Sequence, residues 1–273
     1  MTALKENLER LEESIAAACR KAARARCEVE LMAVSKTYPA STIAEAASLG
    51  LRLFGENRVQ EFAAKSPELE TLRQSEGDGG FNPRVEPSEA VRALAPEELS
   101  SAYPSQMAHL RVHLIGHLQS NKAARAVELF DAVDSLDSLR LAERLNEAAS
   151  KIGKRLPILI EVKLSSEETK AGLEPESAEA AQLLERLPDF QHLDPQGLMT
   201  IAPWGVAEDV TRSCFRSLRT WRDKWAAAHP RLSLEVLSMG MSGDFPLAIE
   251  EGATRIRVGT ALFGKRQPWT GVE

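Results

Sequence analysis

Short apolar, β-branched runs alternate with stretches of helical periodicity along most of the chain, and this alternation constrains the fold more than any other feature. The eight runs span residues 31–35, 51–55, 112–116, 132–136, 158–164, 197–201, 236–239 and 254–258. The clearest helical stretches between them span residues 41–48, 122–130, 139–152, 178–187 and 214–228. Regular alternation is typical of a parallel sheet covered by helices, and eight repeats favour closure of the sheet. The sequence therefore predicts an α/β fold, a (β/α)8 TIM-type barrel.

An additional helix is predicted before the first strand. Apolar residues recur there at steps of three and four, at Leu4, Leu8, Leu11, Ile15 and Ala18, which is the pattern of an amphipathic helix. The chain has 273 residues, 43% of them hydrophobic, which suits one barrel with its own core. We expect residues 1–273 to form a single domain.

Residues 66–108 interrupt the alternation. This segment contains Glu76-Gly77-Asp78-Gly79-Gly80, several prolines and little periodicity, although a short helix at 86–94 is compatible with its sequence. A loop of this length is usually functional or disordered, and its Gly, Asp and Pro content favours disorder. We predict a flexible insertion at 66–108.

Charge and cysteine content narrow the function classes. The 34 basic and 40 acidic residues give a net charge of −6, which argues against nucleic acid as a partner. Three cysteines without a CxxC pair are typical of reduced thiols in the cytoplasm. The N-terminal stretch is charged throughout, and no run approaches the roughly 20 apolar residues of a membrane span. We expect a soluble, cytoplasmic protein that does not contact membranes.

Lys36 directly follows the first predicted strand, and Pro39 prevents further strand pairing. In this fold the chemistry lies where strands end, so the amine is predicted at the barrel mouth. A partly desolvated lysine has a lowered pKa, as imine formation with an aldehyde requires. Without further residues to bind a cofactor, Lys36 would be interpreted as a solvated loop lysine. The Schiff-base interpretation therefore depends on the residues that the other strands bring to the barrel mouth.

Two glycine-containing loops after the last two strands are candidates for phosphate binding. One contains Ser242 and Gly243, and the other contains Gly259 and Thr260 before a short helical turn. Glycine lets an anion approach main-chain N–H groups, and a helical turn adds its positive end. Barrels of this type commonly hold phosphates after strands seven and eight.

Two further patterns resemble known sites without fulfilling them. Residues 259–265 match G-x-x-x-x-G-K, but Arg266 replaces the Ser or Thr that a nucleotide-binding P-loop needs. His109, His113 and His117 are spaced by four, yet in a strand four residues span roughly 13 Å, too far to share a metal ion. We expect no metal site.

Several motifs, taken together, resemble the pyridoxal phosphate homeostasis protein family, relatives of the N-terminal barrel of alanine racemase. The motifs are Ala33-Val34-Ser35-Lys36-Thr37, Phe54-Gly55-Glu56-Asn57, His113-Leu114-Ile115-Gly116, Leu118-Gln119-Ser120-Asn121-Lys122, Gly197-Leu198-Met199-Thr200, Leu237-Ser238-Met239-Gly240-Met241-Ser242-Gly243-Asp244 and Arg257-Val258-Gly259-Thr260. The resemblance runs in order from Leu31 to Arg266. It implies a fold-type III barrel that binds pyridoxal 5'-phosphate (PLP).

The resemblance also implies roles for individual residues. Lys36 would be the Schiff-base lysine, Arg257 would face the pyridine nitrogen, and the phosphate would contact Ser242, Gly259 and Thr260. Asn57 and Met241 complete the expected cofactor-binding set. A fixed positive charge at the pyridine nitrogen keeps it unprotonated, which weakens the ring as an electron sink.

Two functions from different classes fit such a site. The resemblance favours a non-catalytic protein that stores, buffers or delivers PLP in vitamin B6 homeostasis, with apo forms of PLP-dependent enzymes as partners. The alternative is a PLP-dependent amino-acid racemase, which needs a second acid/base group opposite the lysine. Tyr38 follows Lys36 too closely to reach round the ring, Tyr103 lies in the insertion, and no second domain fits after residue 267. We therefore expect a carrier, and a monomer. A phosphosugar enzyme is a third hypothesis.

Overall fold

The fold is described from a computed structural model, which covers residues 2–78, 110–165 and 171–264. Eight parallel strands form a closed barrel in sequence order, and the first strand pairs with the last. The strands are β1 (Glu30–Val34), β2 (Leu53–Glu56), β3 (Arg111–Leu114), β4 (Ala132–Leu136), β5 (Leu156–Glu161), β6 (Leu193–Met199), β7 (Val236–Ser238) and β8 (Arg255–Val258). The predicted barrel is confirmed, and each predicted strand overlaps an observed one.

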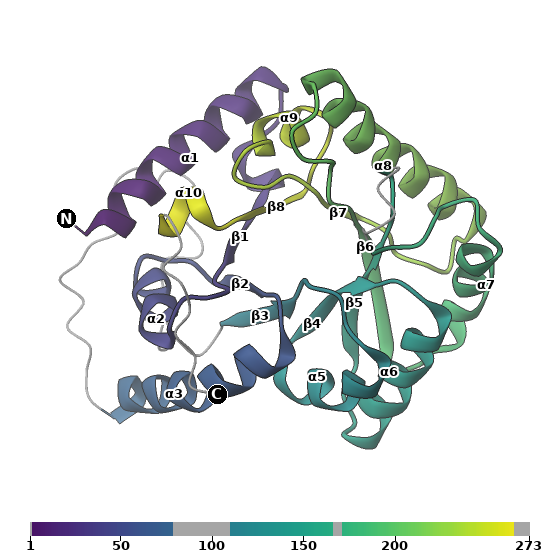
Figure 1. The fold of residues 1–273 in the computed structure, drawn as a ribbon, viewed down its shortest axis with the longest axis horizontal. Coiled ribbons are helices and arrows are strands. Elements are labelled where there is room, and N and C mark those ends of the chain that lie inside the picture. Colours follow the sequence, from purple (N-terminus) through teal and green to yellow (C-terminus); the bar gives the residue numbers. More distant parts are fainter. Residues whose placement is uncertain (1, 79–109, 166–170, 265–273) are drawn as a thin grey trace.

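Helices surround the barrel, as Figure 1 shows in a view along its axis. They are α1 (Ala3–Lys21), α2 (Ala40–Ser48), α3 (Val59–Asp78), α5 (Ala123–Leu129), α6 (Leu139–Lys151), α7 (Ala178–Arg186), α8 (Glu208–Ala228), α9 (Phe245–Glu250) and α10 (Thr260–Phe263). Short 3-10 turns occur at η1 (Arg26–Glu28), η3 (Ser120–Lys122) and η4 (Leu187–Asp189). This ring places every strand end next to a loop that leads into a helix.

The additional N-terminal helix, α1, is confirmed and lies against α9 and α10 (Figure 1). Leu4, Leu8, Leu11 and Ile15 are buried on one face, as their spacing predicts. A polar contact also joins the helix to α10, because the Asn7 side-chain amide donates to the Leu262 carbonyl at 2.9 Å. The helix thus covers the outside of the segment that follows β8.

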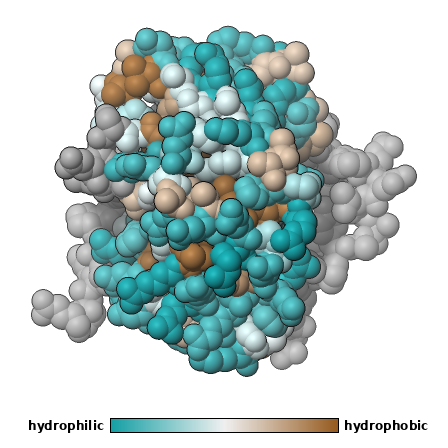
Figure 2. Space-filling view, turned by 90° about the vertical axis from the view of Figure 1, so that its right-hand side faces the viewer, coloured by the Kyte–Doolittle hydropathy of each residue, from teal (hydrophilic) through white to brown (hydrophobic). Residues whose placement is uncertain are grey.

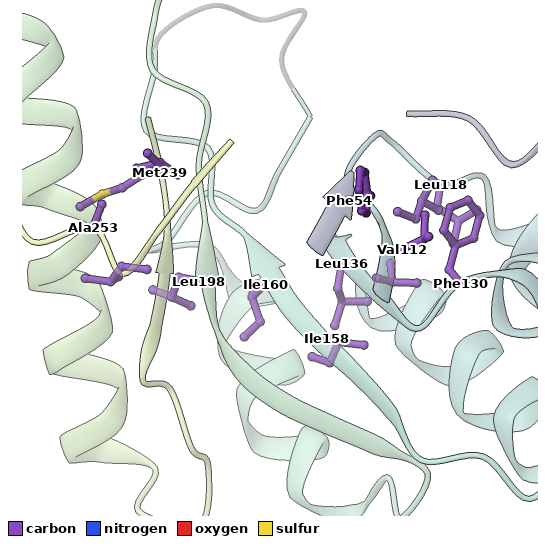
Figure 3. Close-up of a cluster of buried hydrophobic side chains, with 14 of the residues drawn as sticks. Phe54, Val112, Leu118, Phe130, Leu136, Ile158, Ile160, Leu198, Met239 and Ala253 are labelled. Atoms are coloured by element: carbon purple, nitrogen blue, oxygen red, sulfur yellow. The ribbon is translucent and has the colours of Figure 1, made fainter. Parts of the chain in front are cut away.

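The main core lies between the strands and the helices. Side chains alternate along a strand, so one set points outward into this layer and the other into the barrel. Figure 3 shows part of the outer layer, from Phe54 and Phe130 on one side to Leu198 and Met239 on the other. Inside the barrel, a separate small apolar cluster contains Met32, Val34, Leu53 and Ile115.

Two helices differ from the sequence prediction. α3 continues to Asp78, so the segment predicted as a flexible insertion from residue 66 is helical over its first part. The Ser66 hydroxyl donates to the Ala63 carbonyl at 3.3 Å, the acceptor that Pro67 cannot use because it has no N–H. α8 begins at Glu208, before the predicted start at residue 214. Residues 79–109, with the candidate helix at 86–94, lie outside the described residues.

The outer surface over the right-hand side of Figure 1 is mostly hydrophilic, with scattered apolar residues (Figure 2). Among the described helices, none has the length and apolar character that a membrane span requires.

Candidate functional site

Lys36 lies at the mouth of the barrel, in the turn that leaves β1. Its neighbour Ser35 is fully buried, and the Ser35 hydroxyl donates to Glu56 at 2.7 Å on the side of helix α3. Met32 and Val34 of β1 belong to the small apolar cluster inside the barrel, and Lys36 follows them in the turn beyond the last residue of the strand. Lys36 itself is half-buried. Lys36 thus stands where the first strand ends, as the sequence indicates, and the direction of its amine into the barrel mouth stays a prediction.

The loop after β7 forms a tight turn that presents Met241 and Ser242. Gly240 has φ 91°, and a Cβ there would lie 2.5 Å from the Cβ of Ala248 in α9, so only glycine fits this position. The Asp244 carboxylate accepts from the Met241 N–H at 2.5 Å. Burial raises the pKa of Asp244, and its hydrogen bond with Met241 opposes that rise.

The segment after β8 lies close to the end of β1. A Cβ placed on Gly259 would lie 3.3 Å from the Val34 carbonyl oxygen, so the absence of a side chain permits this approach. Gly259 precedes α10, and Thr260 is exposed at its start. The first N–H groups of a helix lack intrahelical acceptors. These two residues therefore present main-chain donors at the mouth.

Two contacts join these loops into one surface. The Ser242 hydroxyl accepts from the Ala261 N–H at 3.2 Å, which connects the loop after β7 to the first turn of α10. The Tyr38 hydroxyl donates to the Gly264 carbonyl at 2.9 Å, and its ring contacts Phe263 with centroids 4.9 Å apart. The turn that carries Lys36 and both predicted phosphate loops thus meet.

Arg257 lies inside the barrel below this surface. It pairs in register with Met32 of β1, and its side chain is buried. The guanidinium donates to the Ser238 carbonyl at 2.7 Å, to the Ser238 hydroxyl at 2.8 Å and to the Thr200 carbonyl at 2.8 Å. Burial lowers the pKa of Arg257, whereas Asp134, Glu161 and Asp244 raise it. The cation is held in one orientation by three fixed acceptors.

Asn57 follows β2 and lies beside the end of β3. A Cβ on Gly116 would lie 2.2 Å from the Asn57 carbonyl oxygen and 2.9 Å from its Cγ. The side chain is partly exposed at the same end of the barrel as Lys36. Asn57 is thus on the mouth, one strand from β1 and on the side away from β8.

A buried charge network fills the barrel interior below the mouth, and sequence reasoning missed it. Arg255 donates to Glu30 at 2.9 Å and to Asp134 at 3.2 Å. The other Asp134 oxygen contacts His113 Nδ1 at 2.9 Å. Burial disfavours the ionised form of Asp134, but His113 and Arg255 outweigh it and lower the pKa of this carboxyl. The sequence contains a sign of this network, because Arg255 and Arg257 are two residues apart in a strand and therefore point to the same face, where two cations need acidic partners.

Glu161 at the end of β5 is a buried acid whose pKa lies far above the ordinary value for a glutamate. Burial raises its pKa to about 7, with Asp137 contributing and Arg257 and His117 opposing. His117 contacts Asp137 at 2.9 Å, whereas His113 contacts Asp134. The two histidines therefore bind different carboxylates, and His109 lies outside the described residues.

The arrangement combines an amine, main-chain N–H donors and a buried cation at one end of the barrel. An amine at a barrel rim can add to an aldehyde, and main-chain donors beside glycine bind anions. A ligand that carries both an aldehyde and a phosphate fits this combination.

Comparison with known proteins gives one family. The family model described as "Alanine racemase, N-terminal domain" matches residues 3–267. The chain is 36% identical to the pyridoxal phosphate homeostasis protein of Aquifex aeolicus, covering 96% of this chain and 98% of that protein. It is 37% identical to the protein of that name from Vibrio cholerae, covering 97% and 98% of the two chains.

Solved structures agree with this result. PipY of Synechococcus elongatus with PLP bound is 41% identical, with a TM-score of 0.70 over 87% of this chain and 93% of PipY. An alanine racemase of Clostridium difficile is 17% identical, with a TM-score of 0.62 over 99% of this chain and 58% of the racemase. The racemase likeness concerns the fold alone.

Proposed function

The chain belongs to the alanine racemase N-terminal domain family and, within it, to the pyridoxal phosphate homeostasis proteins; from this premise we propose that it binds PLP covalently through Lys36. Its function is to store, buffer or deliver this cofactor in vitamin B6 homeostasis, without catalysing a reaction of its own. The observation that carries the proposal is the meeting of the Lys36 turn with the loops after β7 and β8, joined by the Tyr38–Gly264 and Ser242–Ala261 hydrogen bonds.

The residues at the mouth fit PLP. Gly259 leaves space beside Val34 that a side chain would fill, and Ser242 adds a hydroxyl next to the first N–H groups of α10. The buried Thr37 hydroxyl, which directly follows Lys36, has no hydrogen-bond partner within the described residues. A buried polar group in that condition supports a polar ligand at this position.

In this proposal each residue has a definite role. Gly259, Thr260 and Ser242 bind the phosphate, Arg257 faces the pyridine nitrogen, and Asn57 and Met241 contact the ring and its substituents. PLP supplies an aldehyde that reacts with amines and a ring that withdraws electrons. Arg257 keeps its proton because its guanidinium donates to fixed carbonyl oxygens, so the pyridine nitrogen beside it stays unprotonated.

The carrier function is favoured over a racemase by the environment of Tyr38. A racemase needs a second acid/base group that can reach the α-carbon. The Tyr38 hydroxyl instead donates to the Gly264 carbonyl, and the ring is held against Phe263. An unprotonated pyridine nitrogen also supports carbanion chemistry poorly.

The test is direct. Protein incubated with PLP and reduced with borohydride should carry the mass of one reduced pyridoxyl phosphate group on Lys36. Lys36→Ala should abolish the yellow colour and the adduct, whereas the partly exposed control Lys163→Ala should keep both. Amino-acid racemisation that is lost in Lys36→Ala would instead identify an enzyme, and a colourless protein with no adduct would favour a phosphosugar ligand.

Assembly, location and partners extend the proposal. Residues 1–273 would act as one cytoplasmic, monomeric domain that passes PLP to apo forms of PLP-dependent enzymes. Mostly polar outer surfaces such as the one in Figure 2 support a monomer. Light scattering would test the monomeric state.

Transfer of PLP would be tested by mixing loaded protein with an apo aminotransferase. Recovery of transaminase activity faster than with the matched amount of free PLP would support direct delivery.

A further inference from the structure

A buried ion cluster lies behind the end of β1, on the opposite side from the barrel interior. Lys65 of α3 donates to both oxygens of Glu56 at 3.0 and 3.1 Å, and to Glu61 at 2.8 Å. The Lys65 side chain is 9% exposed, Glu56 is fully buried and Glu61 is 11% exposed. The proposed cofactor contacts include none of these three residues.

The cluster holds the main chain on both sides of Lys36. On the N-terminal side, the Lys65 ammonium donates to the Ser35 carbonyl at 3.1 Å, and the Ser35 hydroxyl donates to Glu56 at 2.7 Å. On the C-terminal side, the Thr37 N–H donates to Glu61 at 2.5 Å. The oxygen of Glu61 that accepts from Thr37 also accepts from Lys65, so the two sides share one hydrogen-bonded unit.

The backbone held in this way is in an unfavourable conformation. Thr37 has φ 70°, a region that a β-branched residue rarely adopts. Such a conformation persists only where surrounding contacts enforce it, and it is typical of functional sites. The short bond from the Thr37 N–H to Glu61 is a contact that enforces it. It turns the chain sharply after Lys36, at the end of a strand that is otherwise regular.

We infer that Glu61 and Lys65 are positioning residues for Lys36, which fix its backbone so that the ε-amine is directed at the aldehyde carbon of the cofactor. The inference rests on the proposed function, since it assigns the cluster to the step that Lys36 carries out. In that step the neutral amine nitrogen bonds to the aldehyde carbon, the carbonyl oxygen leaves as water together with the two amine hydrogens, and a carbon–nitrogen double bond remains.

Positioning predicts an effect on bond formation that is separate from cofactor affinity. A misplacement of about 1 Å can slow a reaction on the order of 100-fold. The phosphate contacts come from the segments after β7 and β8, and the hydrogen bonds of the cluster involve neither segment. The ring contact Asn57 directly follows Glu56 of the cluster, so a variant that leaves Glu56 in place separates the two effects best. Pyridoxine 5'-phosphate has the same ring and phosphate with an alcohol in place of the aldehyde, so it reports those contacts alone.

The primary variant is Glu61→Ala, because it removes the acceptor of Thr37 and leaves the buried Glu56–Lys65 pair intact. Stopped-flow absorbance should show Schiff-base formation with PLP slowed by about tenfold or more, with unchanged affinity for pyridoxine 5'-phosphate. Glu61→Gln keeps an acceptor oxygen and should restore a rate close to wild type. Glu68→Ala, an exposed glutamate on the same helix, is the matched control and should have no effect.

A second variant addresses Lys65. Lys65→Met alone leaves Glu56 buried without its cation and endangers folding, so it is combined with Glu56→Gln. The double variant should also form the Schiff base slowly while it binds pyridoxine 5'-phosphate normally. A wild-type rate in Glu61→Ala would overturn the inference, and so would equal losses of rate and of pyridoxine 5'-phosphate affinity. Failure of the wild-type protein to form any Schiff base would instead refute the proposed function.

Discussion

The Ser242 hydroxyl accepts a hydrogen bond from the Ala261 N–H at 3.2 Å and thereby joins the loops that follow β7 and β8. One side chain thus connects the two segments that are proposed to bind the phosphate. The connection has consequences for ligand affinity that can be measured.

Ser242→Ala should weaken PLP binding without preventing the covalent adduct. A hydrogen bond to a charged group contributes about 1.5–3 kcal/mol, which corresponds to a loss of affinity of roughly 10- to 150-fold. Equilibrium titration by absorbance would measure the change. Ser14→Ala, at an exposed position on α1, is the control, and equal affinities for both variants would remove Ser242 from the phosphate site.

Gly240→Ala should destabilise the barrel more than Gly50→Ala. Both glycines have positive φ, 91° and 99°, but a Cβ at Gly240 would meet Ala248 at 2.5 Å, whereas one at Gly50 meets nothing within 4 Å. The backbone cost is therefore common to the pair, and the difference, about 1–3 kcal/mol, isolates the steric overlap. Urea unfolding of the two variants would measure it; similar midpoints would mean that α9 moves aside at no cost.

Glu161→Gln should stabilise the protein at neutral pH. Because the pKa of Glu161 in the folded state is about 7, the folded protein retains a proton that the unfolded chain, with an ordinary glutamate pKa, has lost. The stability that protonated Glu161 contributes is present in full below the pKa of glutamate in the unfolded chain. It is lost as the pH rises through the folded-state pKa of about 7. The total decline is on the order of 3 kcal/mol.

The measurement is the free energy of unfolding in urea between about pH 5 and pH 8. The wild-type value should fall relative to that of Glu161→Gln over this range. Parallel curves for the two proteins would show that Glu161 titrates normally.

Tyr38→Phe should separate the carrier from a racemase. The substitution removes the hydrogen bond to the Gly264 carbonyl and keeps the ring contact with Phe263. We expect a loss of about 1 kcal/mol in stability, with the borohydride-trapped adduct on Lys36 retained. Calorimetry and mass spectrometry would check the two parts. Racemase turnover that disappears in this variant would assign Tyr38 an acid/base role.

Local patterns in the sequence were sufficient for the barrel and for the place of Lys36 in the turn after β1. Short apolar, β-branched runs recur eight times with stretches of helical periodicity between most of them, and each pattern reflects short-range geometry. The errors were also local. The acidic residues Glu208 and Asp209 are typical of a first helical turn and indicate the earlier start of α8. The glycines next to Asp78 favoured a flexible segment, although the residues before them are helical in α3.

What the sequence alone determined was therefore the order of strands and helices, and which residues stand where strands end. Only the tertiary structure decided which side chains meet across the barrel and behind it. Asp134 and Arg255 contact each other although 121 residues separate them, and Lys65 reaches the Ser35 carbonyl across 30 residues. Such pairs depend on how strands and helices rotate when they pack together, and no short window of sequence contains that information.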